Sequence, residues 1–261
     1  MKKLFIYIVL IGIFASCTKT GQQGPQGPTG ATGPTGPGGP SLTNTITGYV
    51  FLYDAYGDLI HTGDSTAYAL LYNTATGAKV DSINANSAGQ YTIPNVLTGT
   101  YNLVAQCPGY AINKTTQNLV LSGGTETLDL KFSAIPASYA TTEYDSIGAS
   151  NVYVKGTIAA PSSHGTVILV YIGTTSSVSA SVPSSYSFVA GTGVAANATR
   201  YSITLPLTTL YNYFSSGNTA YVAVYGAATG YTNGDYIDYA TGNTVYTAVS
   251  AASRSGSFIV P

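Results

Sequence analysis

From residue 44 onward, short runs of β-branched and aromatic residues alternate with clusters of turn-forming residues. Asp54–Asp58, Thr76–Gly77 and Asn86–Gly89 are such clusters, in which Gly permits positive φ and Asp or Asn hydrogen-bonds to the nearby backbone. The chain has 23 Tyr and no Trp, and aromatic side chains suit the half-buried surface of a pleated sheet. No long stretch after residue 17 has helical periodicity. The spacing therefore predicts an all-β chain of sandwich architecture.

We expect two tandem β-sandwich domains, at residues 42–133 and 134–261, with the linker near 134–138. In the second domain, Val152 and Val154 alternate with less apolar neighbours, and residues 166–172 are apolar throughout, which is typical of a central strand. The pattern of this domain suggests an immunoglobulin- or fibronectin-like sandwich. The expected strands are 46–53, 66–72, 79–83, 91–93, 101–107, 117–121 and 126–132, then 151–158, 166–172, 186–189, 200–205, 219–225, 236–239, 244–248 and 256–260.

Four segments of the first domain resemble the carboxypeptidase regulatory-like domain. They are Gly48-Tyr49-Val50, residues 87–96, residues 99–105 and Pro108-Gly109-Tyr110, with Ala88 standing where that family commonly has Asp. The resemblance implies a transthyretin-like sandwich for residues 42–133. It also implies that this domain is an accessory module without catalytic activity of its own.

Residues 21–41 form unbroken G-X-Y triplets, with glycine at every third position from Gly21 to Gly39. The stretch resembles a bacterial collagen-like repeat, whose period exists because only Gly fits at the axis of three wound chains. The X position is often Pro, but the Y position never is. Two alternatives stay open, a single-chain spacer that is part polyproline II, and a short collagen-like trimer.

The amino-terminal segment has the pattern of a secretory signal. Lys2 and Lys3 precede the apolar run Leu4–Phe14, and Ala15-Ser16 leads to Cys17. This end resembles the lipobox of bacterial lipoproteins of the Bacteroidota type, which implies removal of residues 1–16 and a lipid anchor on Cys17, within residues 17–20. The implied location is the outer membrane. The periplasmic or surface face stays open, because Thr18-Lys19-Thr20 lacks the acidic residues that resemble surface-export signals.

Composition and motifs exclude several classes of function. Only 7% of the residues are charged and the net charge is −1, so there is no basic stripe for nucleic acid. The chain has no H-E-x-x-H, G-x-S-x-G, P-loop or C-x-x-C motif. We therefore expect no catalytic residues, no metal and no cofactor.

The titratable residues fit ordinary structural roles. Cys107 follows Leu103 and Ala105 on one face of an expected strand, so we predict a reduced, buried thiol. His164 lies in a turn-like Ser-Ser-His-Gly segment, and the aspartates gather in turns, namely Asp54, Asp58, Asp64, Asp235 and Asp238. None of these spacings matches a Ser-His pair or a calcium loop.

Tyr211, Tyr213 and Phe214 are the candidate ligand-contacting residues. Exposed aromatic side chains there could stack on a glycan or on a protein partner. The alternative is that the segment anchors a strand crossover in the core.

Together these features predict a non-catalytic, lipid-anchored cell-envelope protein, a structural or binding module presented from the outer membrane. One alternative is a glycan- or peptide-binding accessory protein for nutrient capture. Another is an enzyme whose site has no recognisable motif.

Overall fold

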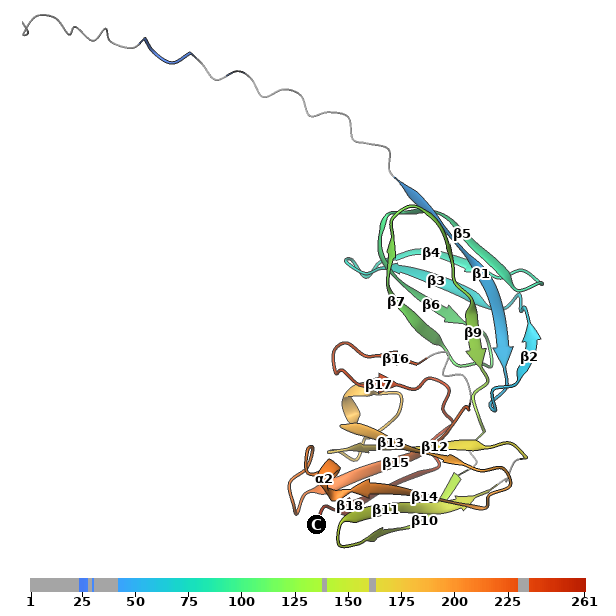
Figure 1. The fold of residues 1–261 in the computed structure, drawn as a ribbon, viewed down its shortest axis with the longest axis vertical. Coiled ribbons are helices and arrows are strands. Elements are labelled where there is room, and N and C mark those ends of the chain that lie inside the picture. The colour runs from blue at the N-terminus through green and yellow to red at the C-terminus, as the bar shows by residue number, and fades with distance from the viewer. Residues whose placement is uncertain (1–23, 28–29, 31–41, 138–139, 160–162, 230–234) are drawn as a thin grey trace, which may run out of the picture. The chain divides into compact units, whose positions relative to one another are not determined.

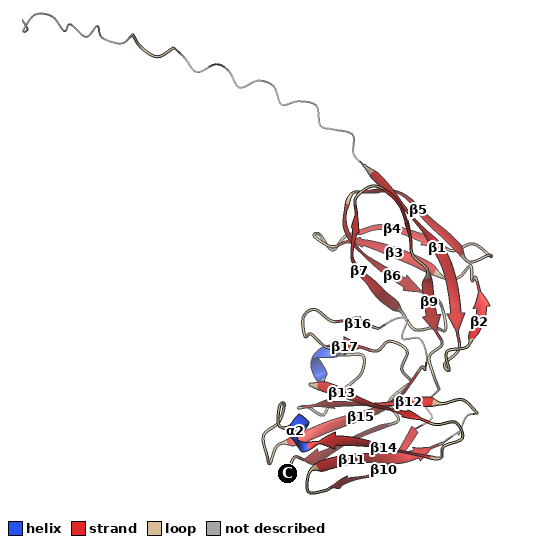
Figure 2. Ribbon diagram, viewed as in Figure 1, coloured by secondary structure: helices blue, strands red, loops and turns tan. Residues whose placement is uncertain are grey.

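The computed structural model describes residues 24–27, 30, 42–137, 140–159, 163–229 and 235–261. The chain divides into two units, residues 1–40 and residues 41–261. In the first unit the described residues are exposed and have no regular secondary structure. In the second, nearly all regular structure is β (Figures 1 and 2), as the sequence predicts. No helix within the described ranges is long and apolar enough to cross a membrane.

The first sandwich packs a sheet built around β1 against a sheet ordered β4-β3-β6-β7. In the first of these sheets β2 and β5 are antiparallel to β1, and β8 and β9 are parallel to it. Its strands are β1 (Thr43–Tyr53), β2 (Leu59–Thr62), β5 (Gln90–Leu97), β8 (Gly124–Thr127) and β9 (Leu130–Ser133). The strands of the other sheet are β3 (Tyr68–Asn73), β4 (Lys79–Asn84), β6 (Gly99–Gln106) and β7 (Asn113–Leu121).

Alternating side chains of these strands form one hydrophobic core. Ile46 and Val50 of β1 face it, as do Leu103 and Ala105 of β6. Cys107 continues the alternation of β6 and is buried in the same core, so the predicted burial of this side chain is confirmed.

The second sandwich packs the sheet β10-β11-β14 against the sheet β13-β12-β15-β18, with all neighbours antiparallel. Its strands are β10 (Ala140–Ile147), β11 (Asn151–Ile158), β12 (Thr166–Gly173), β13 (Phe188–Val194), β14 (Arg200–Pro206), β15 (Thr219–Ala227) and β18 (Arg254–Ile259). The smaller elements are the 3-10 helix η1 (Pro183–Ser185), helix α2 (Leu207–Leu210) and the hairpin of β16 (Tyr236–Ile237) with β17 (Thr244–Val245).

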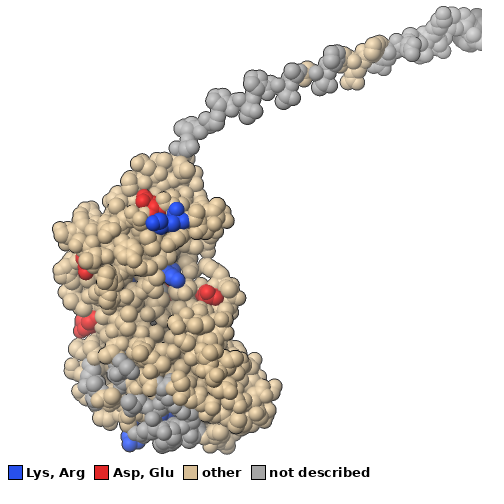
Figure 3. Space-filling model, turned by 180° about the vertical axis from the view of Figure 1, so that it is seen from behind, with Lys and Arg blue, Asp and Glu red and all other residues tan. Residues whose placement is uncertain are grey.

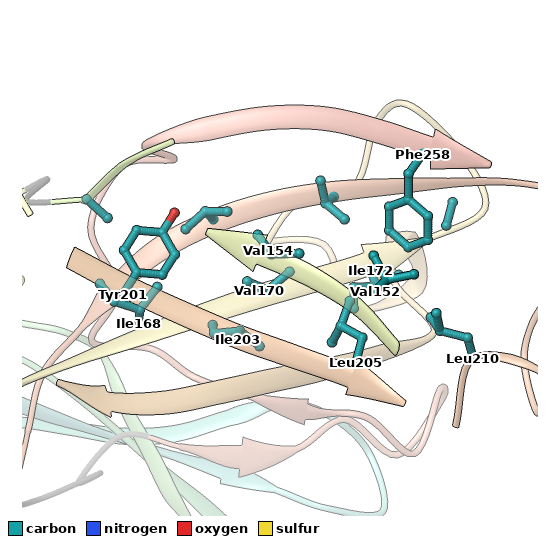
Figure 4. Packing of buried hydrophobic residues seen from close by; sticks show 14 of the residues in the cluster. Val152, Val154, Ile168, Val170, Ile172, Tyr201, Ile203, Leu205, Leu210 and Phe258 are labelled. Carbon is teal, nitrogen blue, oxygen red and sulfur yellow. The ribbon is translucent and has the colours of Figure 1, made fainter. Parts of the chain in front are cut away.

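Strand β12 is central in its sheet and buried on both faces, as its apolar run predicts. Ile168, Val170 and Ile172 point into the sandwich toward residues of β11 and β14 (Figure 4). Leu169 and Tyr171 point to the other face, where they form a second hydrophobic cluster. That face is covered by residues 178–186 and by the segment that contains β16 and β17. The second cluster lies beneath the site described below.

The structure differs from the predicted strands at the end of the first sandwich. The single strand expected at 126–132 is two strands, β8 and β9, which both pair with β1. Between them Leu128 N donates to Thr47 O, and Asp129 Oδ1 accepts a hydrogen bond from Tyr49 N. Gly48 faces this interruption, where a Cβ atom would lie 1.9 Å from Leu128 O. The absence of a side chain at Gly48 therefore permits the close approach.

Candidate functional site

A cavity of about 630 Å³ lies where β7 of the first sandwich meets the β16–β17 segment of the second. Its lining consists of hydroxyl-bearing, aromatic and small apolar side chains with one charged residue, Lys114. The lining residues are Ile112, Lys114, Ser179, Ala180, Ser181, Tyr225, Tyr236, Val245, Tyr246, Thr247, Val249, Ser250, Ala251 and Ala252.

A second cavity, of about 380 Å³, adjoins the first. It is lined mainly by β3, β6 and β7, and by Tyr236 and Asp238 from the second sandwich. Lys114 and Tyr236 line both cavities, and the Lys114 Nζ atom lies 5.0 Å from the centroid of the Tyr236 ring. We refer to the two adjoining cavities together as the groove, and this cation–π pair lies where they adjoin. Charged side chains are sparse over the face of the molecule seen in Figure 3.

A β-bulge positions Lys114. Leu103 of β6 pairs with Thr116, but Ala105 pairs with Asn113, so β7 contains one extra residue in this interval. Asn113 secures the bulge, because its Nδ2 donates to Lys131 O over 2.9 Å and its Oδ1 accepts from Thr115 N over 3.1 Å. Bulges re-aim the side chains beside them, and here the bulge places Lys114 at the groove.

Three tyrosines pack together beneath the larger cavity, and one of them, Tyr225, lines it. The Tyr171 ring meets those of Tyr186 and Tyr225 edge-on, with centroid distances of 4.9 and 5.1 Å. Burial raises the pKa of Tyr171, and it raises the pKa of Tyr186 to about 12. Within the described ranges the Tyr171 hydroxyl has no hydrogen-bond partner, whereas Tyr186 donates to Thr244 O over 3.0 Å. An aromatic cluster with buried hydroxyl groups therefore supports the larger cavity from below.

A carboxylate lies behind one wall of the larger cavity. Asp235 Oδ1 accepts a hydrogen bond from Thr247 N over 3.1 Å, and burial raises the pKa of Asp235. The Thr247 hydroxyl is buried and finds no partner among the residues that the structure describes.

Besides the bond from Tyr186 to Thr244 O, an asparagine holds the β16–β17 hairpin to the second sandwich. Asn243 Nδ2 donates to Pro183 O over 2.8 Å and to Tyr186 O over 3.0 Å. On the other side, Tyr239 accepts a hydrogen bond of 2.9 Å from Asn118 Nδ2 of the first sandwich. The hairpin therefore makes hydrogen bonds to both sandwiches beside the groove.

The aromatic residues singled out in the sequence lie in another part of the second sandwich. Tyr211 and Tyr213 follow α2 and are 49% and 47% exposed, and neither lines the groove. Phe214 is only 4% exposed, because Phe214 N bonds to Leu210 O and the turn directs its ring into the core. Phe214 is therefore a core residue and not a ligand contact. Cys17 lies outside the described residues.

His164, which precedes β12, has two polar neighbours. Its Nε2 lies 3.3 Å from Asp58 Oδ2, its Nδ1 lies 3.4 Å from Ser163 Oγ, and the Tyr56 ring stacks on it. The side chains of His164 and Asp58 are 51% and 69% exposed, so water competes for both groups. A catalytic triad needs a buried acid that orients the histidine, and we interpret this cluster as a surface contact between the sandwiches. The described residues contain no group of three His, Cys, Asp or Glu side chains that could hold a metal ion.

Comparisons with known proteins leave the family open. No family model matches the sequence, and no curated protein matches it. Similar solved structures include a candidate carbohydrate-binding protein from Bacteroides uniformis, with a TM-score of 0.32 and 12% identity over 84% of this chain and 99% of that one. A DUF3823 family protein from Parabacteroides merdae has a TM-score of 0.27 and 12% identity over 82% and 100%. The major pilin subunit of Bacillus cereus has a TM-score of 0.30 and 9% identity over 70% and 64%. Similarity at this level carries no inference about function.

Proposed function

We propose that this protein is a non-catalytic binding module of the cell envelope that holds a glycan in the groove at Lys114 and Tyr236. The observation that carries the proposal is the composition of the groove. Aromatic rings, hydroxyls and amides from both sandwiches converge on two adjoining cavities.

The chemistry of a sugar ring fits such a lining. A pyranose presents hydroxyl groups at its edge and C–H groups on its faces, and a tyrosine offers both an apolar ring and a polar hydroxyl. Tyr236 and Tyr246 supply rings, while Ser179 and Ser181 supply exposed hydroxyls that both donate and accept hydrogen bonds. Pockets of several hundred Å³ are of the size that binds small molecules or a few sugar units.

Anchoring by lipid on Cys17 is part of the same proposal. The signal-like residues 1–16 support it, and the G-X-Y segment would hold the sandwiches away from the membrane by roughly 60 Å if extended. We expect Cys17→Ser to move the protein from the membrane fraction to the soluble fraction, because acyl chains contribute about 0.8 kcal/mol for each buried CH₂ group. A variant that stays in the membrane pellet would refute the anchor and leave the groove proposal intact.

Calorimetry on the glycan that a glycan array identifies tests the binding site. We expect Tyr236→Ala to weaken binding by about tenfold or more, since it removes a ring shared by both cavities. Tyr211→Ala is the matched control, because Tyr211 is an exposed tyrosine away from the groove. The reverse result, with Tyr211→Ala weakening binding and Tyr236→Ala having no effect, would move the site to the segment after α2.

A further inference from the structure

We propose that the bound glycan is acidic and that Lys114 selects it by pairing with a uronate carboxylate. This inference rests on the proposed glycan-binding function. The first observation is that Lys114 is the one charged residue among those that line the 630 Å³ cavity. The chain has nine Lys and Arg in total, and Lys114 is the one that lines the two cavities.

Among the residues that the structure describes, the ammonium group of Lys114 has no carboxylate partner. The described residues contain an ion pair between His164 and Asp58, and no carboxylate of theirs lies within 4.0 Å of Lys114. The side chain is partly buried, and its Nζ atom lies over the ring of Tyr236. A ring face attracts a cation without neutralising its charge. A carboxylate entering the cavity would form a charge-assisted hydrogen bond, which is stronger than a neutral one.

The backbone holds Lys114 in place before a ligand arrives. The bulge at Asn113 fixes the position at which the Lys114 side chain leaves β7. The side chain therefore starts from the groove before a ligand binds. Preorganisation of this kind lowers the entropic cost of binding.

The nearby carboxylates are engaged in other contacts. Asp238 lines the smaller cavity, where its Oδ1 accepts from Thr241 N over 3.0 Å and from Thr241 Oγ1 over 2.8 Å. Asp235 accepts from Thr247 N and does not line the larger cavity. We therefore place the ligand carboxylate in the larger cavity, and a neutral sugar unit beside Asp238.

Matched pairs of polysaccharides test the charge preference. The probes are polygalacturonate, alginate and hyaluronan, each compared with its carboxyl-reduced form by affinity electrophoresis and calorimetry on the full chain. We expect the protein to bind at least one acidic form about tenfold more tightly than its reduced partner. Lys114→Met should abolish that difference, because it keeps an apolar side chain of similar length and removes the charge. Lys114→Arg should retain it.

The controls separate this inference from the function on which it rests. Arg200→Met removes an exposed charge on β14, a strand that contributes no residue to either cavity, and should leave the preference unchanged. Binding of neutral glycans through Tyr236 without any acidic preference would overturn the inference and keep the proposed function. If the protein binds none of the three acidic polysaccharides, the inference is also overturned. Tight binding of a peptide carboxylate that Lys114→Met abolishes would overturn the assignment to a glycan. Unchanged thermal midpoints would show that the variants are folded.

Discussion

At the scale of single residues, the clearest chemical consequence concerns the free thiol of the first sandwich. Cys107 is 4% exposed, and its Sγ lies 3.8 Å from Asp64 Oδ2. Burial, together with the nearby negative charge of Asp64, raises the pKa of Cys107 to about 11. A thiolate is the reactive form, so a raised pKa means a thiol that reacts slowly near neutral pH.

We predict that Cys107 in the folded protein is labelled by iodoacetamide far more slowly than an exposed thiol at pH 8. The rate should rise only in denaturant or as the pH approaches 11. Mass spectrometry of the peptide that contains Cys107 measures this directly, and Cys107→Ser serves as the blank. Rapid labelling of the native protein at pH 8 would contradict the assignment of this thiol to the core.

The same thiol predicts how stability depends on pH. Because the folded pKa lies above the unfolded value, the unfolded state loses its proton first as the pH rises. The contribution of Cys107 to stability is therefore complete below the unfolded pKa and is lost as the pH rises through about 11. Cys107→Ser should remove this part of the alkaline decline in the free energy of unfolding.

At the scale of elements, the sequence predicts the strands that carry an internal pattern. The apolar run of β12 and the alternation along β11 and β6 reflect which faces are buried, and these strands lie where expected. Strand β2 has only exposed side chains, so its sequence lacks the alternation of buried and exposed residues that predicts a strand. The division between β8 and β9 arises from the contact of Leu128 with Thr47, and a distant contact leaves no local signal.

The same reasoning explains why the groove was not predicted. Lys114 and Tyr236 are far apart in the sequence, and each is unremarkable in its own segment. They meet because the first sandwich places a bulge beside the β16–β17 hairpin of the second. The exposed tyrosines after α2 were easier to identify, because their aromatic character is local.

The β16–β17 hairpin gives a prediction at this scale. Each of its strands has only two residues, so side-chain hydrogen bonds hold it in position. Asn243 donates two of them, to η1 and to Tyr186, and Tyr186 donates another to Thr244 O. We expect Asn243→Ala to cost roughly 1–3 kcal/mol locally, because it leaves two carbonyl groups without their partner. Hydrogen exchange should accelerate over residues 236–247 and stay unchanged in the first sandwich.

Asn212→Ala provides the control for this experiment. Asn212 is an exposed turn residue in the same sandwich, so its replacement should leave exchange in the hairpin unchanged. Faster exchange throughout both sandwiches in Asn243→Ala would mean that the hairpin is not a local unit.

At the scale of the whole molecule, the remaining question is whether the G-X-Y segment only separates the sandwiches from the anchor. Residues 21–41 consist of Gly, Pro, Gln, Thr and Ser with one Ala, so they have little apolar surface to bury against a folded domain. Burial contributes about 25 cal/mol per Å² of apolar surface, and without it the segment cannot stabilise a sandwich. We therefore predict that a chain beginning at Leu42 and a chain beginning at Gly21 unfold at the same temperature.

The oligomeric state distinguishes a spacer from a triple helix. As a spacer the segment leaves both chains monomeric, and sedimentation should show this at every concentration. As a triple helix it would make only the longer chain trimeric, with a thermal midpoint that rises with concentration. The absence of Pro at the Y positions favours the monomer, since imino acids at X and Y pre-set the polyproline II backbone. Gly30→Ala gives an independent check, because a triple helix has no room for the added methyl group at its axis. A trimer of the longer chain that Gly30→Ala dissociates would replace the spacer with a trimeric stalk.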